Sequence, residues 1–201
     1  VARRTAEQLF IPLTIGGGVR TADDVARALR AGADKVSINS AAVTRPEVLT
    51  ESAERFGAQC VVASIDAKRG SDGQWKVWVK GGREETPLDA VAWAQECVAR
   101  GAGEILLTSI NQDGARTGYD LALTRAIADT VHVPVIASGG AGQASHLVDA
   151  VVDGRADAVL VAGILHDGLT TVGALKRTMQ HAGLPVRMTD PQRTIHPFQT
   201  V

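Results

Sequence analysis

Aromatic residues are scarce in this sequence, at 3% of 201 residues, and its charges balance at 21 Lys+Arg against 22 Asp+Glu. Few aromatic rings leave little for base stacking, and the lack of a basic excess argues against a surface that coats nucleic acid. The longest apolar run near the C-terminus, Ala158–Leu165, spans eight residues, whereas a membrane helix needs about 20. We therefore expect neither a nucleic acid nor a membrane as a partner.

Cysteine and metal-binding patterns are equally sparse. The two cysteines, Cys60 and Cys97, form no CxxC pair, and the five histidines form no HxH or HxxxH pair. We therefore expect no disulfide framework and no zinc or other metal site, and a reducing cytoplasm fits this composition. Because Walker A, GxSxG and strand-linked GxGxxG motifs are also missing, no cofactor is expected.

Short apolar runs alternate with longer amphipathic stretches along most of the chain. Strands are expected at Phe10–Ile15, Lys35–Asn39, Cys60–Asp66, Glu104–Ser109, Val133–Ser138 and Ala158–Val161. Helices are expected at Thr21–Ala31, Arg45–Phe56, Leu88–Arg100, Leu121–Thr130, Ala144–Val152 and Thr171–Ala182. This order predicts six βα units, with a parallel sheet and helices outside it. The stretch Ala67–Glu85 breaks the rhythm, and its alternating Trp and Val residues predict a β-hairpin inserted in a βα loop.

An internal repeat favours a barrel over an open, doubly wound sheet. Ile11–Gly18 resembles Val133–Gly140, and Ala33–Ser40 resembles Ala156–Gly163. Two strand–helix–strand units that recur in this way are typical of a (β/α)8 TIM barrel built from two four-unit halves. If the later pair forms units seven and eight, the earlier pair forms units three and four, and the hairpin follows the fifth strand.

The length of the chain bears on the same fold. A complete barrel needs about 250 residues, and this chain has 201. We therefore expect residues 1–188 to form a partial (β/α)8 barrel in which the first two βα units are missing. Residues 189–201 show no periodicity and are expected to form a C-terminal tail.

In such a barrel the active site lies at the C-terminal ends of the strands. Gly16–Gly18 and Asn39–Ser40 follow the earlier pair of strands, and Gly139–Gly140 and Ala162–Gly163 hold the matching places in the later pair. Small residues there let backbone N–H groups approach an anion. The repeat predicts two symmetry-related anion pockets, suited to a substrate with a phosphate at each end. The alternative is that these segments are only tight βα turns.

Two aspartates stand at the same edge of the predicted sheet. Asp66 ends the third predicted strand, where it acts as a general acid or base, or else pairs with Lys68 or Arg69. Asp113 follows the fourth predicted strand, and its simplest alternative role is an Asx turn with Gly114.

Two charges stand at the opposite, N-terminal face of the predicted barrel. Lys35 opens one strand and Glu104 opens another. Either they are solvated or paired there, or they line an opening or a partner interface.

Several segments, in this order and spacing, strongly resemble one family: the cyclase subunit of imidazole glycerol phosphate synthase, of histidine biosynthesis. The resemblance covers about Arg3 to Met188. It is carried by Leu13–Gly18, Ala33–Ala42, Val61–Arg69, Gly101–Tyr119 and Ile136–Gly142.

The resemblance implies a twofold (β/α)8 barrel that acts as a lyase and cyclase. Such an enzyme takes ammonia from a glutaminase subunit and a bis-phosphorylated ribulosyl-formimino nucleotide, and makes imidazole glycerol phosphate and aminoimidazole carboxamide ribotide. Asp66 matches one of two acid/base aspartates. The other ends a strand that this chain lacks, so the chain by itself is expected to be inactive. Asp113 matches a further active-site carboxylate, while Asn111 stands where an aspartate is common.

The resemblance also assigns binding roles. Phosphate ligands match Gly18, Asn39 and Ser40 at one end of the substrate, and Gly114, Gly140, Ala162 and Gly163 at the other. Lys35 and Glu104 match half of a four-charge ring around the ammonia entrance, on the N-terminal face where the glutaminase subunit docks as the second chain of a heterodimer. Two alternatives stay open: the phosphoribosyl isomerase of the preceding step, and a non-catalytic fragment that binds phosphate or docks a glutaminase.

Overall fold

The structure is a computed structural model that describes residues 2–188, so the expected tail at 189–201 lies outside the described residues. Its strands are β1 (Thr14–Gly16), β2 (Lys35–Ile38), β3 (Val61–Arg69), β4 (Trp75–Val79), β5 (Glu84–Asp89), β6 (Glu104–Ser109), β7 (Val135–Ser138) and β8 (Ala158–Val159). Its helices are α1 (Ala2–Ala6), α2 (Ala22–Arg30), α3 (Ser40–Thr44), α4 (Glu47–Phe56), α5 (Ala90–Ala99), α6 (Leu121–Ala128), α7 (Ala144–Val152), α8 (Gly163–His166) and α9 (Val172–His181), with a 3-10 turn at Ala58–Cys60.

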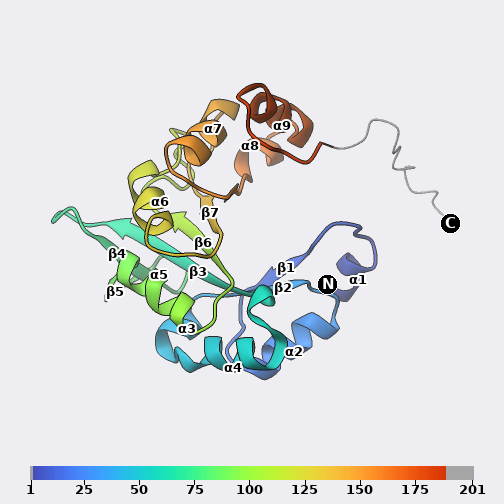
Figure 1. Ribbon diagram of the computed structural model, residues 1–201, viewed down its shortest axis with the longest axis vertical. Coiled ribbons are helices and arrows are strands. Elements are labelled where there is room, and N and C mark those ends of the chain that lie inside the picture. The colour runs from blue at the N-terminus through green and yellow to red at the C-terminus, as the bar shows by residue number, and fades with distance from the viewer. Residues whose placement is uncertain (1, 189–201) are drawn as a thin grey trace.

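The parallel strands form one curled sheet in the order β1-β2-β3-β6-β7-β8 (Figure 1). Helices α2, α4, α5, α6 and α7 pack against these strands. The arrangement is an open half-barrel of the (β/α) type, which confirms the predicted fold class. No helix within residues 2–188 is long and apolar enough to cross a membrane.

The repeat predicted from the sequence is present in the backbone pairing. Thr14 pairs with Lys35 in the register in which Ile136 pairs with Ala158. Before each strand pair an aspartate makes the same contacts: the Leu13 N–H donates to Asp34 Oδ2 at 2.7 Å, and the Val135 N–H donates to Asp157 Oδ2 at 2.9 Å. Helices α2 and α7 occupy matching positions, as do α3 and α8.

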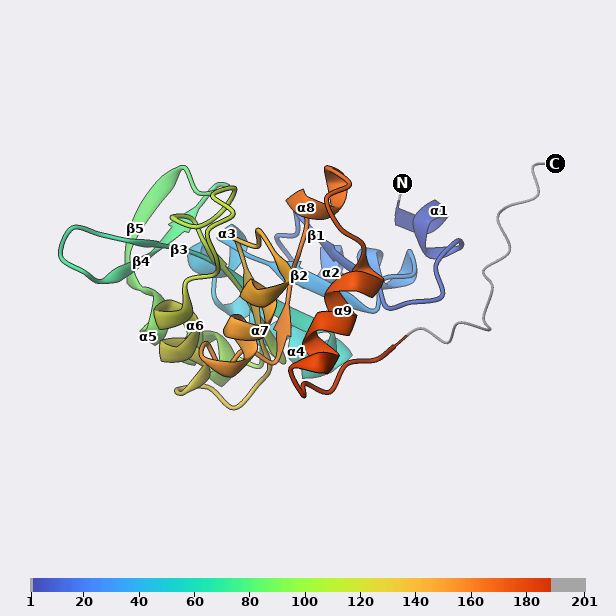
Figure 2. The same cartoon turned by 90° about the horizontal axis from the view of Figure 1, so that it is seen from above.

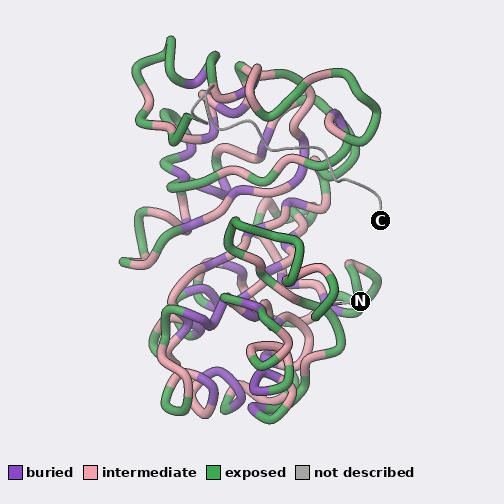
Figure 3. The backbone as a smooth tube through the Cα atoms, turned by 90° about the vertical axis from the view of Figure 1, so that its right-hand side faces the viewer, coloured by how far each residue is buried: buried purple, intermediate pink, exposed green. Residues whose placement is uncertain are grey.

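The core forms two groups of buried residues, and buried stretches are visible in both halves of the molecule (Figure 3). The larger group joins β2, β3, β6 and β7 to α4, α5 and α6, and contains the fully buried Leu49, Ile65 and Ile105. The smaller group holds α7, α8 and α9 against β7, with Leu147, Ile164 and Leu175 at its centre. Because strand side chains alternate between faces, Ile65 packs beneath the helices while Ser64 and Asp66 face the other side.

Several predicted boundaries need correction. The strand expected at Phe10–Ile15 covers only Thr14–Gly16, and Phe10 is 100% exposed. Pro12 has no N–H to donate, and the partner strand β2 begins only at Lys35, so within residues 2–188 no strand pairs with the residues before Leu13. The sequence also gave no sign of α3 and α8, which are too short to show helical periodicity.

The hairpin predicted within Ala67–Glu85 is confirmed and is larger than expected. Strand β3 continues to Arg69 and pairs antiparallel with β4, which in turn pairs with β5. This three-stranded ribbon extends from one side of the sheet (Figure 2). Since β5 runs to Asp89, the next helix begins at Ala90 rather than Leu88, and the Asp89 side chain caps it.

Candidate active site

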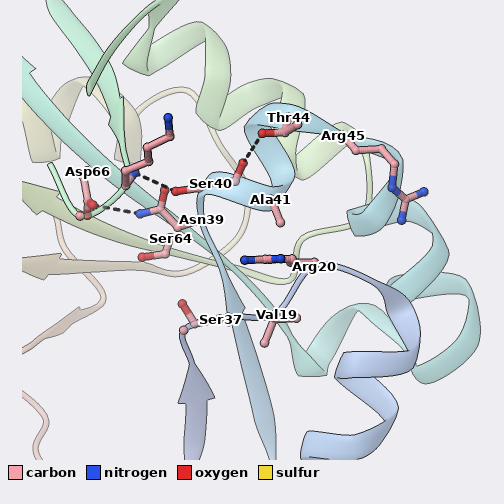
Figure 4. A pocket seen from close by; sticks show the side chains of 14 residues that line it. Val19, Arg20, Ser37, Asn39, Ser40, Ala41, Thr44, Arg45, Ser64 and Asp66 are labelled. Atoms are coloured by element: carbon pink, nitrogen blue, oxygen red, sulfur yellow. Dashed lines mark hydrogen bonds between the residues drawn. The ribbon is translucent and has the colours of Figure 1, made fainter. Parts of the chain in front are cut away.

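A cavity of about 750 Å³, lined mostly by polar and charged residues, lies at the C-terminal ends of β1, β2 and β3 (Figure 4). Ser37 and Asn39 reach it from β2 and its end, and Ser64 and Asp66 reach it from β3. The loop after β1 supplies the Gly17–Gly18 turn, in which both glycines have positive φ, at 88° and 73°. Three predicted site residues near this cavity, Asn39, Ser40 and Asp66, therefore come together with Gly18, as the barrel topology requires.

Asp66 lies in the cavity wall and is held by Asn39. The Asn39 side-chain N–H donates to Asp66 Oδ2 at 3.0 Å. Burial raises the pKa of Asp66; the Asn39 hydrogen bond lowers it in part, and the negative charge of Asp113 raises it further. A carboxyl group with a raised pKa beside a polar cavity is suited to exchange protons with a bound molecule.

The alternative role for Asp66, an ion pair with a neighbouring cation, is wrong. Lys68 Nζ lies 4.8 Å from the ring centroid of Trp78, and the Arg69 guanidinium lies 5.2 Å from that of Trp75. Both cations therefore lie over aromatic rings of the hairpin. Within residues 2–188, neither forms an ion pair with Asp66.

Of the Asn39 amide and the Ser40 hydroxyl group beside this cavity, the hydroxyl group is the one open to a ligand. Asn39 Oδ1 is buried and has no hydrogen-bond partner among the described residues. The Ser40 hydroxyl oxygen accepts the Lys80 backbone N–H at 2.9 Å, so its own hydrogen is free to donate elsewhere. Lys80, which has φ of 55°, and Gly81 come from the turn between β4 and β5 and close one side of the cavity.

Sequence reasoning missed Lys80 and also Arg20, which lines the same cavity. The position of Lys80 depends on how the hairpin folds back over β3, which no local pattern encodes. For Arg20 a signal was present, because it directly follows the Gly16–Val19 turn at the end of a strand.

The predicted residues of the second anion pocket lie around the ends of β6, β7 and β8. Gly140 packs against the loop after β6: the Gly118 N–H donates to Gly140 O at 2.9 Å, and a Cβ on Gly140 would lie 2.0 Å from Gly118 O. Gly163 follows Ala162 and is the first residue of α8. A Cβ added to Gly163 would lie 3.9 Å from a guanidinium nitrogen of Arg116. The structure thus brings these small residues together with the loop that carries Gly114.

Asp113 lies in the same loop with its side chain exposed. Its backbone N–H donates to Ser109 O at 2.9 Å, and the Ala115 N–H donates to Gln112 O at 2.9 Å. Neither Gly114 nor Ala115 donates to the Asp113 side chain, so the Asx-turn alternative is wrong. Nearby, Asn111 Oδ1 accepts the Arg69 backbone N–H at 2.8 Å and ties this loop to the end of β3.

Lys35 and Glu104 form an ion pair at the opposite end of the sheet. They come from β2 and β6, the two neighbours of β3, so the pair spans β3 at the N-terminal face. The side chain of Lys35 is 31% exposed to solvent and that of Glu104 is 18% exposed. Pairing is one of the roles expected for these charges, and a place at an opening or a partner interface stays a prediction. Elsewhere within residues 2–188, no cluster of three His, Cys, Asp or Glu residues is placed to hold a metal ion, and both cysteines are free and buried.

A curled parallel sheet with a twofold repeat, and a carboxylate in a polar cavity at the strands' C-terminal ends, defines an enzyme domain of the (β/α)-barrel class. Comparison with known proteins makes the assignment specific. The family described as "Histidine biosynthesis protein" matches residues 1–171.

Two relatives carry the same name, imidazole glycerol phosphate synthase subunit HisF. The protein of Myxococcus xanthus (strain DK1622) is 72% identical over 187 residues, which is 93% of this chain and 74% of the relative. That of Microcystis aeruginosa (strain NIES-843 / IAM M-2473) is 54% identical over 190 residues, 93% of this chain and 75% of the relative. The chain belongs to the HisF family, the cyclase subunits of imidazole glycerol phosphate synthase in histidine biosynthesis.

This finding confirms the resemblance seen in the sequence, and it favours the cyclase over the isomerase of the preceding step. As a HisF subunit, the chain is part of a lyase that has a partner subunit.

Proposed function

We propose that the cavity at the strands' C-terminal ends closes an imidazole ring. The substrates are ammonia and a bis-phosphorylated ribulosyl-formimino aminoimidazole carboxamide nucleotide, and the products are imidazole glycerol phosphate and aminoimidazole carboxamide ribotide. The observation that carries the proposal is the position of Asp66. Its carboxyl group lies in the wall of this cavity, and burial there raises its pKa. The HisF family supports the choice of reaction.

In this mechanism Asp66 transfers protons at the reacting centre. Its Oδ2 accepts the Asn39 amide hydrogen, which fixes the plane of the carboxylate and leaves Oδ1 for the substrate. Ring closure and cleavage both need a proton to be removed from one atom and delivered to another, and a carboxyl group whose pKa is raised above its ordinary value is suited to both transfers. Asp113 is proposed as a further carboxylate of the site, and its charge acts on Asp66.

The two ends of the substrate are proposed to lie in the two halves of the repeat. One phosphate binds at Gly18, Asn39 and Ser40. The other binds at Gly114, Gly140, Ala162 and Gly163. The matching strand registers and matching helix positions of the two halves support this assignment. Glycines with positive φ leave backbone N–H groups uncovered for phosphate oxygens.

Ammonia is proposed to enter at the opposite face, where Lys35 and Glu104 pair. A glutaminase subunit docked on this N-terminal face of the strands would release ammonia beside the pair, at the end of the sheet remote from Asp66. Location in the cytoplasm stays a prediction, as does the expectation that no cofactor and no metal takes part.

The reaction is tested by chromatography of the products formed from the bis-phosphorylated nucleotide and ammonium salts. The assay uses this chain fused to the quarter of the Myxococcus xanthus relative that the match leaves uncovered, so that it spans that relative's whole length. We expect both products in equal amounts, and ammonium-dependent turnover. Binding of the nucleotide without formation of either product would contradict the proposed reaction and favour a non-catalytic binding role.

A further inference from the structure

Among the basic residues that line the first cavity, Arg20 differs from the others because no carboxylate within residues 2–188 pairs with it. Three basic residues line this cavity: Arg20, Arg45 and Lys80. The Arg45 guanidinium donates twice to the Glu51 carboxylate, at 2.6 and 2.9 Å, and Lys80 Nζ pairs with Glu84. Within residues 2–188, no carboxylate forms an ion pair with Arg20.

The direction of the Arg20 side chain follows from its anchored backbone. The Arg20 N–H donates to Asp24 Oδ2 at 2.9 Å, and the same carboxylate accepts the Thr21 N–H in the capping box of α2. These bonds fix the start of the helix and leave the guanidinium directed into the cavity, whereas Arg45 points away from it (Figure 4). A guanidinium in this position presents several N–H donors to an anion seated at Gly18 and Ser40.

The matching place in the second half of the repeat has no side chain. Helix α7 begins after Gln143 as α2 begins after Thr21, so the residue that corresponds to Arg20 is Gly142. A Cβ on Gly142 would lie 2.0 Å from Arg116 O, so no side chain fits there. Arg116 itself, which faces Gly163, is ion-paired with Asp167. The two anion pockets therefore share a backbone plan and differ in charge.

We propose that Arg20 binds a phosphate oxygen of the substrate and makes the pocket at Gly18 and Ser40 the stronger of the two phosphate sites. This inference rests on the proposed function. The consequence is that a pseudo-symmetric site receives an asymmetric substrate in one direction, because the two ends bind phosphate with unequal strength. Residues that are the same in both halves of the repeat cannot distinguish the two ends of the substrate. Arg20 can, because the corresponding residue in the other half is the uncharged Gly142.

The test is an NMR titration of the ¹⁵N-labelled chain with inorganic phosphate at low ionic strength, following the amides of Gly18, Ser40, Gly140 and Gly163. We expect Arg20→Gln to weaken phosphate binding at Gly18 and Ser40 by about tenfold or more. The Kd at Gly140 and Gly163 is expected to stay unchanged. Arg20→Lys should lose less, because it keeps the charge and loses only the forked geometry.

Arg30→Gln is the matched control, since Arg30 is an exposed arginine at the other end of α2 and its loss changes the net charge equally. Equal phosphate affinity at Gly18 in the wild type and in Arg20→Gln would overturn the inference while leaving the phosphate pockets intact. An equal loss in Arg30→Gln would also overturn it, because the effect would then be one of net charge. No response of any of the four amides in the wild type would instead remove the proposed phosphate pockets, and the role of Arg20 with them.

Discussion

Replacing Asp66 with asparagine is expected to lower kcat for ammonium-dependent ring closure by roughly 10²- to 10⁴-fold. The change keeps the shape of the side chain, and the Asn39 amide can still donate to the remaining oxygen. What is lost is the group that takes up and returns a proton. Steady-state kinetics of the fusion protein, together with a thermal melt of each variant, measure this effect and separate it from a loss of folding.

The pH profile gives a second readout for the same residue. Because burial and the charge of Asp113 raise the pKa of Asp66, the acid limb of kcat/KM should lie at higher pH than an exposed aspartate would give. That limb should disappear in Asp66→Asn. Asp153→Asn, at an exposed position after α7, removes the same charge away from the cavity and should leave kcat unchanged. An Asp66→Asn rate within about threefold of the wild type would make Asp66 a structural residue.

A second large effect is expected from Gly140→Ala, which should lower the free energy of unfolding by about 3 kcal/mol or more. The glycine has φ of 105°, and a Cβ there would lie 2.0 Å from the Gly118 carbonyl oxygen. The added methyl group therefore causes backbone strain and also forces the loop after β6 away from β7. Urea denaturation at fixed pH measures the change.

Gly18→Ala is the control for that variant, because it occupies the matching place in the other half of the repeat. Its φ of 73° is also positive, but a Cβ there meets nothing within 4 Å. It should cost only the backbone strain, about 1 kcal/mol. Similar losses in the two variants would mean that the loop after β6 does not hold Gly140 as the structure shows.

The fold could be predicted largely because each βα unit carries its own local signals. Thr21 caps its helix, glycine turns end the strands, and the buried strand at β3 is almost continuously apolar. The strand expected from Phe10 was wrong because a strand needs a partner strand as well as a suitable composition. Phe10 and Ile11 have the composition of a strand, yet no strand among the described residues pairs with them, and they are exposed.

The candidate site could be predicted only in outline. Asp66 was evident because a carboxylate at the end of an apolar strand is unusual, and Gly18 because the glycine run recurs at Gly140. The hydrogen bond between Asn39 and Asp66 joins residues 27 positions apart and depends on the register of β2 with β3. The place of Arg20 after a glycine turn was visible in the sequence, but its lack of an ion-pair partner among residues 2–188 was not, because this depends on which carboxylates the fold brings near it.

The most direct test of the account is a titration of this chain with the bis-phosphorylated nucleotide, by calorimetry and by amide shifts together. One molecule that bridges both halves of the repeat should bind per chain. The amides of Gly18 and Ser40 and those of Gly140 and Gly163 should then shift along one binding curve with a single Kd. Two molecules per chain, or shifts confined to one half, would contradict the central claim that the two pockets hold the two ends of one substrate.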